Sequence, residues 1–128
     1  MVQSIHVDGA RTGGTRWPLV VAAYDELLRR HPTPGAAVSR AAALLHAGGP
    51  GSALEALDAL CSARASMSEY QPYWAVRAGA LEGAGRFAEA RGAYDRAMGL
   101  CEHPRVRDFL GRKRAAAAAK ADAPGERR

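Results

Sequence analysis

Residues 74–97 read WAVRAGALEGAGRFAEARGAYDRA, and the pattern of this segment predicts the fold of the chain. It holds two apolar stripes at helical spacing, separated by a turn glycine. Large and small residues follow a fixed order in it: Trp74, Ala78, Leu81, Gly85, Ala90, Tyr94 and Ala97. A shift of 37 positions toward the N-terminus gives the matching set Ala37, Ala41, Leu44, Gly48, Ala53, Leu57 and Leu60. Self-similarity at a period of about 20–50 residues is typical of stacked repeat proteins.

A further step of 33 positions carries Ala53, Leu57 and Leu60 onto Val20, Tyr24 and Leu27, and Pro32 stands where that unit ends. The order of residues resembles the tetratricopeptide repeat, whose small residues let two helices of a hairpin approach closely. One hairpin cannot bury its own apolar face, but stacked hairpins can. The sequence therefore predicts an all-α, tetratricopeptide-like array of about 2.5 repeats with a C-terminal capping helix.

The same periodicity predicts six helices over residues 17–30, 36–47, 52–62, 73–84, 87–100 and 104–120. Thr15 is the expected N-cap of the first helix, and residues 64–71 form a connection without a clear stripe. We expect residues 1–114 to form the repeat domain and residues 115–128 to form an alanine-rich, basic tail. No β-type alternation of useful length is present.

Charge is distributed unevenly along the 128 residues. Residues 1–102 carry ten Arg and Lys against ten Asp and Glu, whereas residues 103–128 carry eight against three. The net charge of +5 therefore belongs to the C-terminal part. This distribution does not favour direct DNA binding by the folded part of the chain.

Several protein classes are excluded by the sequence. No apolar run approaches the roughly 20 residues that a membrane span needs, and the N-terminus lacks a secretory signal, so we expect a cytoplasmic protein without membrane contact. Cys61 and Cys101 fall on apolar helical patterns, which predicts buried, reduced thiols. The four histidines are far apart, and no nucleophile elbow or phosphate loop is present. We therefore expect no enzyme, no metal site and no cofactor.

Two surfaces are candidates for binding. The repeat frame places a mostly apolar groove on the inner helices, lined by Val38, Ala42, Leu45, His46, Ala75, Gly79 and Glu82, where a peptide could lie. Arg112, Lys113 and Arg114 form a basic cluster that could contact nucleic acid or an acidic polymerase surface. The simpler reading of that helix is a cap that buries Val106, Phe109 and Leu110. Arg40 and Arg77 could either pair with nearby acids or contact a partner.

Several segments together resemble the C-terminal tetratricopeptide-like extension of extracytoplasmic-function RNA polymerase sigma factors. The matching segments are TRW at 15–17, YDELL at 24–28, PTP at 32–34, SRA at 39–41, YQPYWAVRA at 70–78, GRFAEARGAYDRA at 85–97 and DFL at 108–110. The family commonly has Asn-Arg-Ala-Val-Ala at the fourth of these, so Ser39 and Ala42 depart from it. The resemblance covers residues 3–114.

This resemblance implies a non-catalytic module that regulates transcription through contacts with sigma domains, RNA polymerase or another regulator. The two promoter-reading domains of such sigma factors have no counterpart here, so we expect either a fragment or a free-standing remnant of the extension. The incomplete N-terminal repeat leaves apolar surface on which a second copy could dock. The alternative hypothesis is a generic tetratricopeptide scaffold without a role in transcription.

Overall fold

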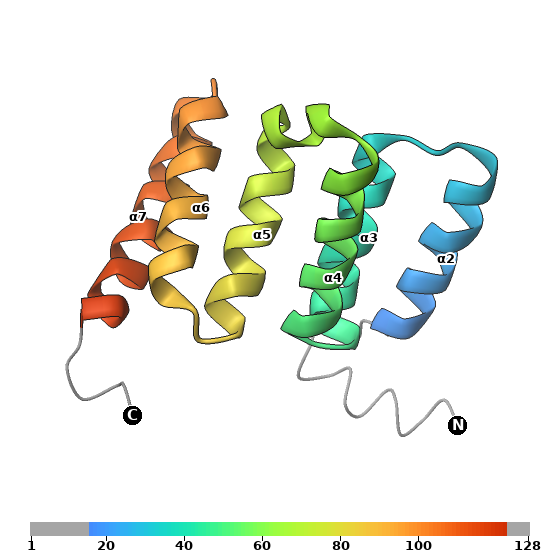
Figure 1. The fold of residues 1–128 in the computed structure, drawn as a ribbon, viewed down its shortest axis with the longest axis horizontal. Helices are drawn as coiled ribbons and strands as arrows, with labels where there is room; N and C mark the ends of the chain where they lie inside the picture. Colours follow the sequence, from blue (N-terminus) through green and yellow to red (C-terminus); the bar gives the residue numbers. More distant parts are fainter. Residues whose placement is uncertain (1–15, 123–128) are drawn as a thin grey trace.

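The computed structural model describes residues 16–122. It contains, in order, α2 (Trp17–Arg30), α3 (Pro34–Ala47), α4 (Pro50–Ala63), the 3₁₀ helix η1 (Ala65–Glu69), α5 (Gln71–Gly83), α6 (Phe87–Leu100) and α7 (Pro104–Asp122). The helices follow one another across the molecule in sequence order (Figure 1). The described part of the chain has no strand, so the fold is the predicted all-α array of stacked hairpins.

The helix bounds obey the predicted period. A shift of 33 residues carries α2 onto α4, and a shift of 37 carries α4 onto α6. A shift of 37 also carries α3 onto α5 and places α5 inside α7. We call α3, α5 and α7 the A helices and α2, α4 and α6 the B helices. The cap at the C-terminus is therefore in register as the A helix of a third hairpin.

Prolines start more helices than expected. Pro34 is the first residue of α3 and Pro50 is the first residue of α4, two positions before the predicted starts. The first amides of a helix have no partner in the helix, so a residue without N–H costs nothing there. Thr33 caps α3 by accepting a hydrogen bond from the amide of Ala36 at 3.2 Å. Thr15, the expected cap of α2, lies outside the described residues, and Arg16 occupies that position.

Alanines form the crossings between helices, as predicted. Ala41, Ala53, Ala78 and Ala90 are each 0% exposed, and Leu57 and Tyr94 pack with them at 0% and 2%. One core cluster joins α4, α5, α6 and α7, and a second joins α3, α4, η1 and α5. Cys101 is buried as expected, whereas Cys61 is half-buried. Large side chains are few, so close helix approach replaces bulk in this core.

Three expectations about burial, the connections and the domain boundary need correction. The stripe of α2 is only half-buried and Leu27 is 40% exposed, because α2 packs mainly on α3 among the described helices. The connection at residues 64–71 contains η1, whose Met67 is 2% exposed. The domain boundary expected after residue 114 falls inside α7, and Ala117 beyond it is fully buried. Residues 115–122 therefore belong to the last helix of the array.

Candidate functional site

Three arginine–aspartate pairs repeat along the array. Each joins a B helix to the A helix that follows it, and each pair occupies the same place in its repeat. The pairs are Arg40 with Asp25 at 2.6 Å, Arg77 with Asp58 at 2.8 Å, and Arg114 with Asp95. Arg40 and Arg77, whose role the sequence left open, are thus structural partners of acids in the neighbouring helix.

The pairs are open to solvent. The side chain of Arg77 is 21% exposed and that of Asp58 is 66% exposed. Ion pairs of this kind contribute about 0–1 kcal/mol each, so the three pairs add little to the stability of the array. Arg77 also donates to the Tyr73 hydroxyl at 3.4 Å. Burial raises the pKa of Tyr73, although the charge of Arg77 acts in the opposite direction.

The predicted groove is partly filled by its own side chains. Val38, expected to line it, is only 3% exposed and packs in the core with Leu57, Met67 and Tyr73. Leu45 crosses from α3 to α5, where a Cβ placed on Gly79 would lie 3.8 Å from Leu45 Cδ2. An added methyl group there would make ordinary van der Waals contact with Leu45, so Leu45 is the side chain that joins the two A helices at this point. Ala42, Ala75 and Gly79 remain half-buried and make up the accessible apolar part.

The remaining two groove residues are bound by neighbours. His46 is exposed, but its ring stacks on Trp17 of α2 with centroids 4.3 Å apart. Glu82 Oε1 accepts a hydrogen bond from the Tyr94 hydroxyl at 2.7 Å and lies 3.5 Å from Lys113 Nζ. Burial and the contact with Glu82 together raise the pKa of Tyr94. Glu82 therefore connects α5, α6 and α7 and does not project into an open groove.

The basic cluster separates into different roles. Arg114 is held by Asp95, and Lys113 is held by Glu82. Arg112 is exposed, and no ion pair within residues 16–122 involves it. A shift of 37 residues carries Ala75 onto Arg112. The A-helix register thus places Arg112 on the same line as the predicted groove, so the two candidate surfaces are one face of the array.

Phe109 is a site residue that sequence reasoning assigned wrongly. We expected Val106, Phe109 and Leu110 to be buried on α6, but only Leu110 is, at 3% exposed. Val106 is 40% exposed and Phe109 is 52% exposed. Adjacent residues on a helix point about 100° apart, so Phe109 and Leu110 cannot face the same neighbour. The 37-residue register, if extended to α7, would have placed Phe109 on the A-helix face.

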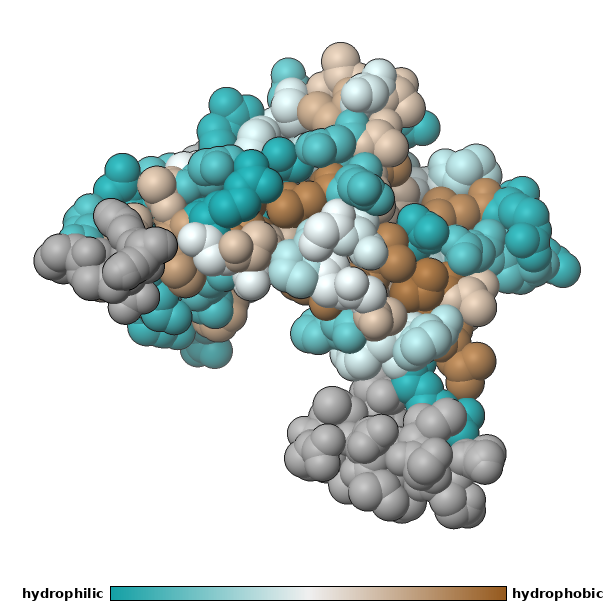
Figure 2. All heavy atoms as spheres, turned by 60° about the horizontal axis from the view of Figure 1, so that its bottom comes forward, coloured by the Kyte–Doolittle hydropathy of each residue, from teal (hydrophilic) through white to brown (hydrophobic). Residues whose placement is uncertain are grey.

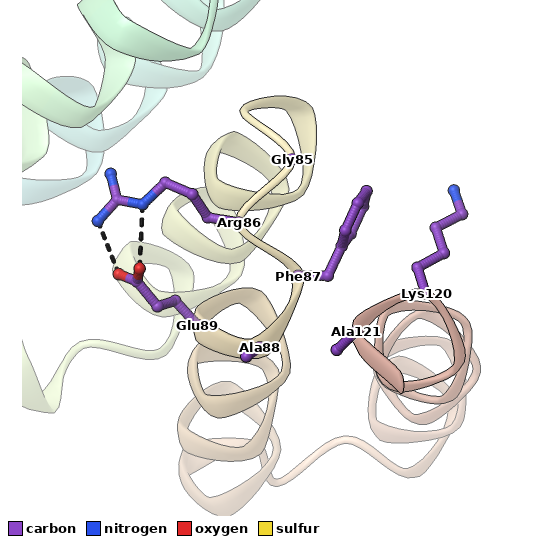
Figure 3. Close-up of a pocket in the computed structure, with 7 residues that line it drawn as sticks. All are labelled: Gly85, Arg86, Phe87, Ala88, Glu89, Lys120 and Ala121. Carbon is purple, nitrogen blue, oxygen red and sulfur yellow. Dashed lines mark hydrogen bonds and ion pairs between the residues drawn. The ribbon is translucent and has the colours of Figure 1, made fainter. Parts of the chain in front are cut away.

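A shallow hollow of about 300 Å³ lies between the start of α6 and the end of α7 (Figure 3). Lys120 Nζ lies 5.4 Å from the centroid of the Phe87 ring, and Arg86 binds Glu89 through hydrogen bonds of 3.1 and 2.7 Å. The hydrogen bonds from Arg86 lower the pKa of Glu89. The charged groups of this hollow are thus engaged with one another or with an aromatic ring.

The surface carries no continuous apolar channel on the face that Figure 2 shows. Apolar side chains reach it in separate patches bordered by hydrophilic ones (Figure 2). Within residues 16–122, no cluster of three or more His, Cys, Asp or Glu side chains is arranged to hold a metal ion. Among the helices of that part of the chain, none has the length and hydrophobicity needed to cross a membrane. The features assembled here define a stacked helical-hairpin repeat protein.

Comparison with known proteins adds one relative. An uncharacterized protein of Rhizobium meliloti (strain 1021) is 33% identical to the chain over 99 residues. The match covers 77% of this chain and 23% of that protein, so the chain spans less than a quarter of the length of this curated relative. No protein-family model matches the chain, and no solved structure matches it.

Proposed function

We propose that the chain is a non-catalytic protein-interaction module that regulates transcription, as the resemblance to the C-terminal extension of extracytoplasmic-function sigma factors implies. The observation that carries the proposal is the single face made by α3, α5 and α7. On it, half-buried Ala42, Ala75 and Gly79 lead to exposed Phe109 and Arg112. A face with small apolar residues at one end and an aromatic and a cation at the other suits a protein segment with an acidic end.

The relative from Rhizobium meliloti supports a role within a longer protein. More than three quarters of its length lies outside the match, which leaves room for further domains. In a sigma factor those domains would be the two that read the promoter. In this proposal the repeat array contacts sigma domains, RNA polymerase or another regulator in the cytoplasm, and it requires no cofactor.

The proposal is tested by direct binding to defined partners. The chain is immobilised, and bacterial core RNA polymerase and the two promoter-reading domains of such a sigma factor are passed over it separately. We expect one of the two to bind, and we expect Phe109→Ala combined with Arg112→Glu to weaken that binding about tenfold or more. Glu55→Gln, an exposed change on α4, is the control that should leave binding unchanged.

A transcription assay provides a second test. The chain with core polymerase alone should give no promoter-specific transcripts, because residues 1–128 contain no resemblance to a promoter-reading domain. Binding to neither partner in the first assay would favour the alternative, a tetratricopeptide scaffold without a role in transcription. Specific initiation by the chain and core enzyme alone would contradict both hypotheses.

A further inference from the structure

An apolar pocket of about 210 Å³ lies at the end of the first complete hairpin, away from the face described above. It is formed where the α2–α3 connection meets the end of α4 and η1, at the upper end of the molecule in Figure 1. Its walls include Leu28, Pro32, Ala37, Leu60, Ala63 and Met67, and Arg64 stands beside them. The volume is below the roughly 300 Å³ of small-molecule sites, and it suits a single side chain.

The next repeat shows what fills this space. A shift of 37 residues carries Ala37 onto Trp74, and the same shift carries the wall residues Leu60 and Ala63 onto Ala97 and Leu100 of α6. Trp74 packs against both core clusters at that place. The pocket is therefore the space that an indole occupies in the second repeat and that alanine leaves open in the first.

The contacts of Trp74 indicate which kind of side chain fits such a space. Its Nε1 donates a hydrogen bond to the Ser68 carbonyl at 2.7 Å, and the Tyr73 ring meets it edge-on at 5.2 Å. The guanidinium of Arg96 lies over the indole ring, 4.8 Å from its centroid. An aromatic side chain beside a cation is thus already accommodated once by this fold.

The first repeat also offers a cation at the pocket. Arg64 follows the last residue of α4, its side chain is exposed, and no ion pair among residues 16–122 uses it. An arginine beside an apolar pocket selects a ligand with a carboxylate next to its apolar group. Aromatic side chains that enter such pockets contribute much of the binding energy at protein interfaces.

We propose that this pocket binds one tryptophan side chain from a partner protein, with an acidic residue beside the tryptophan in the partner paired with Arg64. The pocket thereby adds an anchor point to the interaction module, and the inference rests on the proposed function only in requiring that the partner be a protein. It requires neither RNA polymerase nor sigma domains. Among the described residues that line the pocket only Arg64 is charged, so one carboxylate in the partner is enough to pair with it.

The test uses a defined peptide and the full chain. The ¹⁵N-labelled protein is titrated with acetyl-Glu-Trp-Glu-amide, and amide shifts are followed by NMR. We expect the largest shifts at Ala37, Leu60, Ala63 and Met67, and we expect acetyl-Glu-Ala-Glu-amide to cause none. Shifts centred on Phe109 and Arg112, or no shifts at millimolar peptide, would overturn the inference while leaving the binding assay with sigma domains and polymerase unaffected.

Variants distinguish binding in the pocket from nonspecific binding of the peptide. Ala37→Trp should fill the pocket as Trp74 does in the next repeat, keep the helical circular dichroism spectrum and abolish the peptide shifts. Ala115→Trp is the matched control, since it adds the same side chain at an exposed position of α7 and should leave the peptide shifts unchanged.

Arg64→Glu tests the charge beside the pocket. It should reduce the affinity for acetyl-Glu-Trp-Glu-amide about two- to fivefold and leave the affinity for acetyl-Gln-Trp-Gln-amide unchanged. Equal affinity of Ala37→Trp and the unmodified chain would refute the pocket as the site, and the shift map of the unmodified chain decides the matter if that variant does not fold.

Discussion

Ala90 has no exposed surface and belongs to the cluster that joins α4 to α7. Because the interior is close-packed, three additional carbon atoms at this crossing have no space. We expect Ala90→Leu to lower the free energy of unfolding by about 1–3 kcal/mol. Urea denaturation followed by circular dichroism measures this. The neighbouring change Glu89→Gln removes an exposed contact with Arg86 and should alter stability by less than about 0.5 kcal/mol, so equal effects of the two changes would contradict the packing at Ala90.

The hydroxyl group of Tyr94 also makes a contribution to stability that can be measured. Its pKa is raised, first by burial and then by its hydrogen bond to Glu82. A group whose pKa is raised in the folded state contributes stability that is present below its unfolded pKa of about 10 and is lost as pH rises toward the folded value. We expect Tyr94→Phe to cost about 1–3 kcal/mol at pH 7.

The difference in the free energy of unfolding between Tyr94→Phe and the unmodified chain should become smaller above pH 10. Only the unmodified chain has a hydroxyl here that ionises more easily in the unfolded state than in the folded state. Denaturation curves at pH 8, 10 and 11 test this. Glu82→Gln keeps the size of the hydrogen-bond acceptor and removes its charge, so it should cause part of the loss of stability expected for Tyr94→Phe. A constant difference at all three pH values would show that Tyr94 does not titrate with unfolding.

At the scale of elements, the sequence predicted the helices well and their ends less well. The bounds of α6 were predicted without error, since an uninterrupted stripe runs from Phe87 to Leu100. α3 and α4 begin two residues early because we took Pro34 and Pro50 as breakers, whereas a proline suits a first turn. η1 was missed because five residues of 3₁₀ helix carry no periodic stripe, only the single buried Met67.

The candidate site was predictable only in part, and for a related reason. The repeat frame found the inner face, but spacing alone did not show that Val38 is covered by Leu57 and Tyr73 or that Glu82 is bonded to Tyr94. The register of α7 was not recognised, because the five identical alanines at residues 115–119 show no helical periodicity. As a result Arg112 and Phe109 were not recognised as part of the same face as Ala75.

The basic cluster of α7 supports a prediction about nucleic acid. Arg114 and Lys113 are paired with acids, so neutralising Arg112, Lys113 and Arg114 together removes two ion pairs and one charge that has no acidic partner among residues 16–122. We expect this triple change to leave the fold intact and to lower stability by at most about 2 kcal/mol. Any affinity of the chain for DNA should be weak, fall steeply with salt and be reduced further by the triple change.

Fluorescence anisotropy with two unrelated DNA duplexes at low and high salt provides the measurement for the basic cluster. Arg112→Gln alone should account for most of the reduction, because Arg112 is the member without an acidic partner among the described residues. Arg114→Gln is the matched control and should act mainly on stability. Tight binding to one duplex at high salt would place the functional surface elsewhere.

For the whole molecule, the array predicts stability that differs from end to end. Each hairpin contacts its neighbours only, so the free energy of opening depends on how many neighbours a helix has. α2 has no buried residue, whereas α3, α5 and α6 have four each. We therefore expect amides of α2 to exchange with solvent fastest among the described helices and those of α3, α5 and α6 to exchange slowest.

The Asp25–Arg40 pair allows this prediction to be tested by a local change. Asp25→Asn removes one ion pair between α2 and α3 and leaves the rest of their packing in place. An exposed pair contributes about 0–1 kcal/mol, so exchange in α2 should rise by at most about fivefold while α6 is unaffected. The matched change Asp95→Asn at the other end should act on α7 and leave α2 unaffected. Hydrogen exchange measured by NMR at pH 7 follows both ends in one experiment. If either change accelerates exchange equally in all helices, the chain opens as one cooperative unit. The pocket at the first hairpin and the exposed residues of α7 would then be coupled through the stability of the whole array.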